Sequence, residues 1–256
     1  RGRDEYLAAV GARMDQALQT RTPFAERLVH FWANHFAVSV DKVLVVALAG
    51  SLEADAVRPH VMGRFEDLLL AVVRHPAMLL YLDQAQSVGP QSPAGKRASE
   101  RRQRPRGLNE NLAREILELH TLGVDGGYTQ DDVRELARAI TGWSVPLPRD
   151  LDAGATTAFR FRANAHEAGA RQVLGQRYAA AGEAQGRAIL RDLALHPATA
   201  RHVCGKLARH FVSDAPPRAL VDRMADAWMR SGGALRPVYA AMIDSPEAWA
   251  ADARKL

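Results

Sequence analysis

The stretch at residues 107–143, GLNENLAREILELHTLGVDGGYTQDDVRELARAITGW, has the clearest structural pattern in the chain. It predicts two helices joined by a glycine-rich turn. Asn109 can cap the first helix, because its side-chain oxygen can accept a backbone N–H of the first turn. We expect this helix over about residues 110–122, followed by Gly123 as the left-handed residue that commonly ends a helix. We also expect the rest of the chain to pack around this helix pair.

The second helix has a capping box. Thr129 supplies the capping hydroxyl and Asp132, three residues later, replaces the more usual glutamate or glutamine. We expect the helix to run to about Ile140, because Gly142 follows and favours a stop. The two helices are therefore predicted from their ends as well as from their periodicity.

Successive side chains of a helix point about 100° apart around its axis. At this angle, the first helix has an apolar face and a polar face. The apolar face contains Leu112, Ala113, Ile116, Leu117 and Leu119. The polar face contains Asn111, Arg114, Glu115 and Glu118. His120 falls in the middle of the apolar face. The helix thus offers a carboxylate, guanidinium and amide cluster outside, and an imidazole inside.

Apolar residues recur three or four positions apart over most of the remaining chain, which is typical of amphipathic helices. Only residues 39–50 leave the choice between a short helix and an extended segment open. The sequence therefore predicts a mainly α fold, a multi-helix globular bundle in which residues 1–256 form a single domain. Residue 1 is arginine and no signal peptide is visible, so we expect the chain to be part of a longer protein.

Two segments depart from the helical pattern. Residues 84–107 are rich in Gly, Pro, Ser and Arg, and we expect a long flexible loop. Residues 144–181 form an insertion after the helix pair, in which 158–162 alternates Phe with Arg. This alternation predicts a strand, and we expect it to pair with 171–174 in one small β-hairpin.

His-Pro-Ala occurs twice at the end of a predicted helix, starting at His75 and at His196. Proline disfavours helix at the residue before it and suits the first position of the next helix. We therefore predict helix–corner–helix units in which the two histidines cap the C-terminus of the preceding helix.

The composition is that of a soluble globular protein, with 47% hydrophobic and 25% charged residues. No apolar run approaches the roughly 20 residues of a membrane span. The net charge is +5, and the basic residues are overwhelmingly arginine, which suits carboxylate or phosphate binding but also reflects a coding bias. The single cysteine, Cys204, excludes an internal disulfide and a multi-thiolate metal site, and its apolar surroundings predict a buried side chain.

The 107–143 stretch resembles the bacterial domain-of-unknown-function 1800 family. RLVHFWANHF (27–36), RPHVMGRFEDLLLAVVRHPAMLLYLD (58–83), HEAGARQVLG (166–175) and HPATARHVCGKLARHFVSD (196–214) fit the same family, so the resemblance covers nearly the whole chain. It implies a mostly helical bacterial protein, often exported to the periplasm, although a cytoplasmic location stays open. It implies no established reaction.

The first candidate site lies inside the bundle. His35 and His120 occupy the apolar faces of separate helices, and His166 with Glu167 could join them. Such a group could hold a divalent ion such as Zn²⁺ or Fe²⁺ with imidazole and carboxylate ligands. Alternatively, each buried imidazole is satisfied by a backbone carbonyl or a carboxylate of the core.

The second candidate site is the polar face that begins at the cap of the first helix. Its members are Asn109, Glu110, Asn111, Arg114 and Glu115, with Glu118 beside them. Glu115 could act as a general acid or base if neighbouring carboxylates and burial shift its pKa. Arg114 and the amides could bind an anionic or polyhydroxyl ligand. The alternatives are a solvated face with Glu110–Arg114 pairs, or buried pairing that ties helices together.

Asn34, on the polar face of the predicted 24–36 helix, is a further ligand-binding candidate. The arginine run at 97–106 lacks aromatic interleaving and a recognition helix, so nucleic-acid binding is not favoured. Phosphate-loop, dinucleotide and nucleophile-elbow motifs are also absent from the sequence. We predict either an enzyme, hydrolase-like or metal-assisted, or a non-catalytic helical module that binds a protein partner or a cell-surface polymer.

Overall fold

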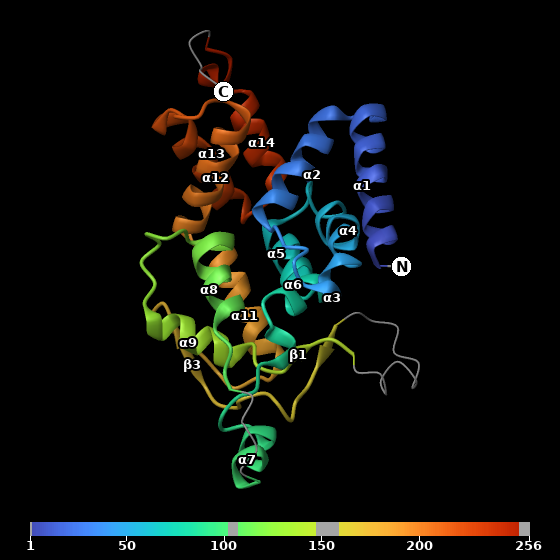
Figure 1. The fold of residues 1–256 in the computed structure, drawn as a ribbon. Helices are drawn as coiled ribbons and strands as arrows, with labels where there is room; N and C mark the ends of the chain where they lie inside the picture. The colour runs from blue at the N-terminus through green and yellow to red at the C-terminus, as the bar shows by residue number, and fades with distance from the viewer. Residues whose placement is uncertain (1, 102–106, 147–158, 251–256) are drawn as a thin grey trace.

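The structure is a computed structural model that describes residues 2–101, 107–146 and 159–250. Helices form almost all of the regular structure, which confirms the predicted mainly α class (Figure 1). The α-helices of the described residues are α1 (Gly2–Gln19), α2 (Pro23–His35), α3 (Val43–Val46), α4 (Ala49–Ser51), α5 (Phe65–Val73), α6 (Pro76–Tyr81), α7 (Pro93–Glu100), α8 (Asn111–Glu115), α9 (Gln130–Ala139), α11 (Glu183–Ala194), α12 (Pro197–Phe211), α13 (Arg218–Ser231) and α14 (Leu235–Ile243). The π-helical and 3-10 turns are η1 (Leu52–Val57), η2 (Gln84–Gln86), η3 (Ile116–Thr121) and η4 (Pro246–Trp249).

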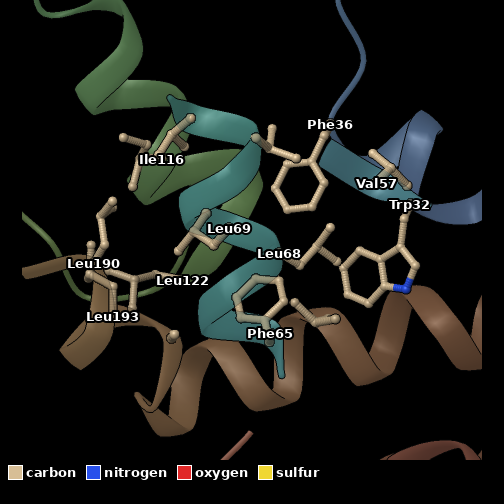
Figure 2. Close-up of a cluster of buried hydrophobic side chains, with 14 of the residues drawn as sticks. Trp32, Phe36, Val57, Phe65, Leu68, Leu69, Ile116, Leu122, Leu190 and Leu193 are labelled. Atoms are coloured by element: carbon tan, nitrogen blue, oxygen red, sulfur yellow. The ribbon is translucent and has the colours of Figure 1, made fainter. Parts of the chain in front are cut away.

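Helix α5 lies at the centre of the hydrophobic core (Figure 2). Its Phe65, Leu68 and Leu69 side chains are fully buried. On one side, Phe65 meets the ring of Trp32 at 5.6 Å between centroids and that of Phe36 at 6.4 Å. On the other side, Figure 2 shows Leu69 facing the side chains of Ile116, Leu122, Leu190 and Leu193. The 107–143 helix pair therefore forms one wall of the core around α5, and is not itself its centre.

The ends of the first helix of that pair agree with the sequence to within one residue. The N-cap of α8 is Glu110, one residue after the predicted Asn109, because the first helical bond runs from the Arg114 N–H to the Glu110 carbonyl. The Asn109 side-chain oxygen still accepts a free N–H of this end, that of Asn111, at 2.8 Å. Gly123 has φ +88°, so the chain turns there in the left-handed region that favours glycine. The helix thus begins and ends where its cap residues place it.

Between these ends the helix widens from α8 into the π-helical turn η3. Leu122 donates its N–H to the carbonyl of Leu117, five residues back, at 3.0 Å. The Thr121 hydroxyl donates to the carbonyl of Ile116 at 2.6 Å. The wider turn rotates Leu119 outward, where it is 43% exposed, so its prediction on the apolar face was wrong. His120 is buried, as the helix periodicity predicted.

The second helix, α9, has the predicted capping box. The Thr129 hydroxyl accepts the N–H of Asp132, and the Asp132 carboxylate accepts the N–H of Thr129 at 2.7 Å. The helix ends at Ala139, and Gly142 has φ +83°. The start and the end of α9 therefore both follow from residues next to them in the sequence.

The predicted hairpin between 158–162 and 171–174 is wrong. Strand β2 (Arg160–Phe161) instead pairs antiparallel with β1 (Trp143–Ser144), directly after the helix pair. Strand β3 (Arg171–Val173) forms its own hairpin with β4 (Gln176–Tyr178). The described residues therefore contain two small sheets where the sequence predicted one, because strand pairing depends on what each segment packs against.

The predicted 84–107 loop contains regular structure. Besides η2, residues 93–100 form α7, which projects from the lower end of the molecule in Figure 1. Ser92 caps α7 by accepting the N–H of Gly95 at 3.1 Å. The segment is anchored by Gly89, whose N–H bonds the carbonyl of Ala165 at 2.9 Å. The arginines at 102, 104 and 106, part of the predicted basic run, lie outside the described residues.

The two His-Pro-Ala corners are helix boundaries, but the histidines cap the helix that follows. His75 Nδ1 accepts the N–H of Ala77 at 3.2 Å, and His196 Nδ1 accepts that of Ala198 at the same distance. The predicted C-terminal capping role is therefore corrected to an N-cap. Proline has no N–H, so the next free donor is two residues after the histidine, within reach of its ring.

Other expectations concern burial and membrane insertion. Cys204 is fully buried, as predicted, and burial raises the pKa of its thiol.

The sequence left open whether residues 39–50 form a short helix or an extended segment. Residues 43–46 form a short helix. No helix in the described ranges combines the length and the apolar character needed to cross a membrane.

Candidate functional site

The polar face at the start of α8 opens onto a pocket of about 640 Å³. The lining residues are Asp83, Gln86, Gly107, Leu108, Asn109, Glu110 and Asn111. The pocket brings three of the predicted polar residues together with Asp83 and Gln86, which the sequence reading did not include. Two segments about 25 residues apart thus contribute carboxylates and amides to one open cavity.

Asp83 is held firmly at this pocket. Its backbone has φ +57°, an uncommon left-handed conformation for a non-glycine residue, although aspartate tolerates it better than most. Lys42 donates from Nζ to the Asp83 carboxylate at 2.8 Å and to the Tyr81 carbonyl at 2.6 Å. The lysine therefore positions the carboxylate and balances its charge.

Asn109 connects the two segments of the pocket. Its side-chain N–H donates to the Leu82 carbonyl at 3.2 Å, and its backbone N–H donates to the Ser87 hydroxyl at 3.1 Å. Since its oxygen also accepts the N–H of Asn111, the Asn109 amide is occupied by structural bonds. Asn111, in contrast, is exposed at the pocket, and its amide is better placed to meet a ligand.

Glu110 ties α8 to α9. Gln130 donates to its carboxylate at 2.7 Å, and Arg114 contacts the same carboxylate at 3.3 Å. Arg114 also donates to the Gln130 side-chain oxygen at 2.9 Å. The Glu110–Arg114 pair is the i, i+4 pair considered from the sequence, and the half-exposed Arg114 acts here as a structural link.

Glu115 lies one helical turn after Asn111, on the same side of α8. It is half-buried, and burial first, then the neighbouring Glu118 carboxylate, raises its pKa. Glu118 in turn accepts the Tyr128 hydroxyl at 3.1 Å. Glu115 is not among the residues that line the pocket, although Asn111, one helical turn before it, is. A carboxyl group with a raised pKa is suited to donate a proton.

The two predicted inward histidines do meet. The rings of His35 and His120 lie 6.2 Å apart, and both side chains are buried. His35 Nε2 donates to the backbone carbonyl of His120 at 3.1 Å, which is the structural alternative that the sequence left open. His202, which the sequence reading missed, lies 6.4 Å from the His35 ring.

These imidazoles are held neutral by burial, which lowers the pKa of His35 and brings that of His120 to about 3. The positive charge of the nearby Lys206 is the second cause of the lowered pKa of His120. The Nδ1 atoms of His35 and His120 are buried without a hydrogen-bond partner. In the portion of the chain that the structure describes, no three or more His, Cys, Asp or Glu side chains are grouped so as to hold a metal ion.

His166 and Glu167 form a separate buried cluster. His166 Nδ1 lies 3.1 Å from the Thr141 carbonyl. The Glu167 carboxylate accepts the N–H of Gln91 at 3.1 Å and faces Arg138 at 3.4 Å and Arg171 at 3.8 Å. These contacts tie segments of the fold together, and the structure places neither residue beside the inward histidines.

Asn34 is exposed on α2 and belongs to none of these three groups. The residues that the sequence reading missed are Asp83, Gln86, His202 and Lys206. One signal could have found Lys206, since only four of the 34 basic Lys and Arg residues are lysines. Gln86 stood in the predicted loop and Asp83 directly before it, and neither had a local signal.

The comparison with protein-family models gives one result. The family described as "Protein of unknown function (DUF1800)" matches residues 1–256, and the chain therefore belongs to that family. No curated protein and no solved structure matched it.

Proposed function

We propose that the protein is a carboxylate-dependent hydrolase whose substrate binds in the pocket formed by residues 83–86 and 107–111. The observation that carries the proposal is the convergence of carboxylates and amides in one open cavity, with Asp83 and Asn109 already held in place. Such groups bind polyhydroxyl or amide-bearing molecules through directed hydrogen bonds. The proposed substrate class is therefore a polar polymer of the cell surface.

Two carboxyl groups have separate roles in this proposal. Glu115, whose pKa is raised, donates a proton to the leaving group. Asp83, kept beside the Lys42 ammonium, accepts a proton from the attacking water. Asn111 and Gln86 orient the substrate. Arg114 and Glu110 act as positioning residues, since their bonds hold α8 against α9.

The test is hydrolysis of soluble peptidoglycan and of chromogenic glycosides and esters by the purified protein. Asp83→Asn and Glu115→Gln should each lower the rate by about 10²-fold or more, as is typical for loss of an acid or base. Asp131→Asn, in a surface pair with Arg134, is the matched control and should keep full activity. Equal activity in all three variants would remove Asp83 and Glu115 from the mechanism.

The pH profile gives an independent check of the proton donor. A general acid must be protonated, so activity should fall as the pH rises through the raised pKa of Glu115. Glu115→Gln should lose most of the rate, and its remaining activity should no longer fall over this pH range. If the remaining activity still falls over the same pH range, the proton donor is another group.

A metal-assisted form of the enzyme would place a divalent ion at His35 and His120. Two imidazoles with an ammonium nearby suit a cation poorly, so we favour the form without a metal at these residues. Thermal unfolding with and without added Zn²⁺ or Fe²⁺ tests this choice. A melting temperature raised in the wild type and unchanged in His120→Gln would favour the metal form.

A second candidate, a non-catalytic binding module, is favoured by the surface of α1. Leu7, Met14 and Leu18 are 56%, 58% and 81% exposed, and their spacing places them on one stripe of the helix. The opposite side faces the protein, where Ala9 approaches Gly50 closely. Such a stripe is typical of a surface that meets a partner.

Binding to a purified bacterial cell-envelope fraction separates the two candidates. If the pocket binds the polymer, Asp83→Asn should weaken sedimentation with the envelope, and replacing Leu7, Met14 and Leu18 together by serine should not. The reverse result would favour the binding module. Export to the periplasm is part of either proposal, and cell fractionation of the full-length protein tests it.

A further inference from the structure

A second open cavity, of about 930 Å³, lies over the solvent-facing side of α5. Residues three, four and seven positions apart share one face of a helix, and α5 with the residue that follows it lines the cavity in this way with Asp67, Leu70, Ala71 and Arg74. Other parts of its lining come from His60, from residues 159–161 and from Glu183. The cavity shares none of the described residues that line the polar pocket of residues 83–86 and 107–111.

Arg74 is fixed at one end of this α5 face. Its guanidinium lies over the Phe159 ring at 3.9 Å from the centroid, and its Nη2 pairs with the Glu183 carboxylate at 3.0 Å. Burial lowers the pKa of Arg74, and the Glu183 charge offsets this only in part. Glu183 is the only acidic partner of Arg74 within the described residues, so the Nη1 group can pair with a second carboxylate.

Asp67 lies at the other end of the same face. Its side chain is exposed, and no basic side chain of the described ranges pairs with it. Arg74 keeps a helical backbone conformation, so the two residues are about 10 Å apart along the helix axis at 1.5 Å per residue. The half-buried Leu70 and Ala71 lie between them. The cavity thus has an acceptor of positive charge and a donor to negative charge at the two ends of an apolar strip.

His60 adds a neutral hydrogen-bond acceptor. Its Nδ1 lies 2.9 Å from the Ala56 carbonyl, so this nitrogen carries the hydrogen and Nε2 keeps its lone pair. Within the described residues, His60 Nε2 has no hydrogen-bond partner. An amide N–H of a ligand in the cavity could therefore donate to it.

We propose that this cavity binds a short peptide of two or three residues by its two free ends. The terminal ammonium group pairs with Asp67 and the terminal carboxylate pairs with Arg74. Three extended residues span about 10 Å, which matches the separation along α5, whereas the charges of a single amino acid lie too close together. Small apolar side chains of the peptide lie on Leu70 and Ala71, and His60 accepts an amide N–H.

The first experiment is isothermal titration calorimetry of the purified protein at pH 7 with trialanine, N-acetyltrialanine and trialanine amide. Trialanine should bind saturably. Blocking either end should weaken binding by about tenfold, the effect expected for losing one hydrogen bond to a charged group. If trialanine does not bind saturably at millimolar concentration, or if both blocked peptides bind as tightly as trialanine, the proposal is wrong.

The second experiment assigns the ammonium group to its partner. Asp67→Asn should bind trialanine about tenfold more weakly, and acetylation of the peptide should then have no further effect, whereas amidation should still weaken binding. Glu66→Gln, on the same helix but outside the cavity lining, is the matched control and should bind like the wild type. Thermal unfolding checks that both variants are folded.

If Asp67→Asn binds trialanine like the wild type, or still loses about tenfold on acetylation of the peptide, the ammonium group does not pair with Asp67 and the proposal is wrong. Neither Asp67 nor Glu66 lines the polar pocket. The hydrolysis assays described above therefore test the proposed function separately from peptide binding.

Discussion

At the residue scale, the histidine of a His-Pro-Ala corner caps the following helix through its ring nitrogen Nδ1. Helix starts leave backbone N–H groups without partners, and a side-chain acceptor placed before the first turn stabilises them. Serine, threonine, aspartate and asparagine usually supply it. In this chain His75 and His196 do so, because proline at the next position already fixes the backbone for entry into the helix.

We therefore expect His196→Ala to lower the free energy of unfolding by about 1 kcal/mol, the typical value of a lost helix cap. His196→Asn keeps an acceptor and should lose clearly less. Urea unfolding of the two variants is the measurement. Equal losses would show that the His196 ring contributes through packing and not through its bond to Ala198.

The buried imidazoles make stability depend on pH. The folded pKa of His120 is about 3, below the 6.5 of a free imidazole, so the unfolded chain binds a proton first as the pH falls. The stability is therefore fully present above pH 6.5 and is lost progressively towards pH 3. His35 shifts in the same direction, with burial as the main cause.

Between pH 6.5 and 5, each such histidine should lower the free energy of unfolding by up to about 1.4 kcal/mol per pH unit. His120→Leu should give a shallower slope over this window, whatever its effect on stability at pH 7. Chemical unfolding at several pH values measures the slopes. Identical slopes in the two proteins would contradict a neutral buried His120.

At the element scale, the turn between the two helices of 107–143 has two glycines with similar backbones and different neighbours. Gly123 has φ +88° and Gly127 has φ +83°. A Cβ at position 123 would approach His202 Nδ1 to 2.8 Å, whereas nothing lies within 4 Å of one at position 127. Alanine substitutions at the two positions therefore distinguish two contributions to the free energy of unfolding. One is the cost of a left-handed backbone, and the other is the cost of a methyl group close to His202.

Gly127→Ala should destabilise the protein by about 1 kcal/mol, the cost of a left-handed alanine. Gly123→Ala should cost more, because its methyl group also displaces the His202 ring. Thermal or urea unfolding compares the two variants directly. If Gly127→Ala costs as much as Gly123→Ala, the contact between Gly123 and His202 has no energetic weight.

At the scale of the whole molecule, Glu167 links its own segment, which includes Arg171, to two distant ones. Its carboxylate meets the backbone at residue 91, Arg138 on α9 and Arg171 on β3. The Glu167 and Arg171 side chains are only 8% and 9% exposed. Removing one partner of a buried pair leaves the other charge without compensation.

Glu167→Ala should therefore lower the free energy of unfolding by about 3 kcal/mol. Asp131→Ala, which removes an exposed pair with Arg134, should leave the unfolding midpoint nearly unchanged. Urea unfolding of the two variants tests this contrast. A small effect of Glu167→Ala would mean that water enters the cluster and screens its charges.

The sequence by itself determined the two helices of residues 107–143 and their approximate ends, because caps, glycines and periodicity act between residues a few positions apart. Asn109, Thr129 with Asp132, and Gly123 all lie where their local chemistry places them, and the burial of His120 follows from the same periodicity. Only the tertiary structure decided the strand partners, the outward turn of Leu119, the meeting of Asp83 with Asn109, and that of His202 with His35. These arrangements depend on contacts between segments far apart in the chain, and periodicity within one element carries no information about its partner.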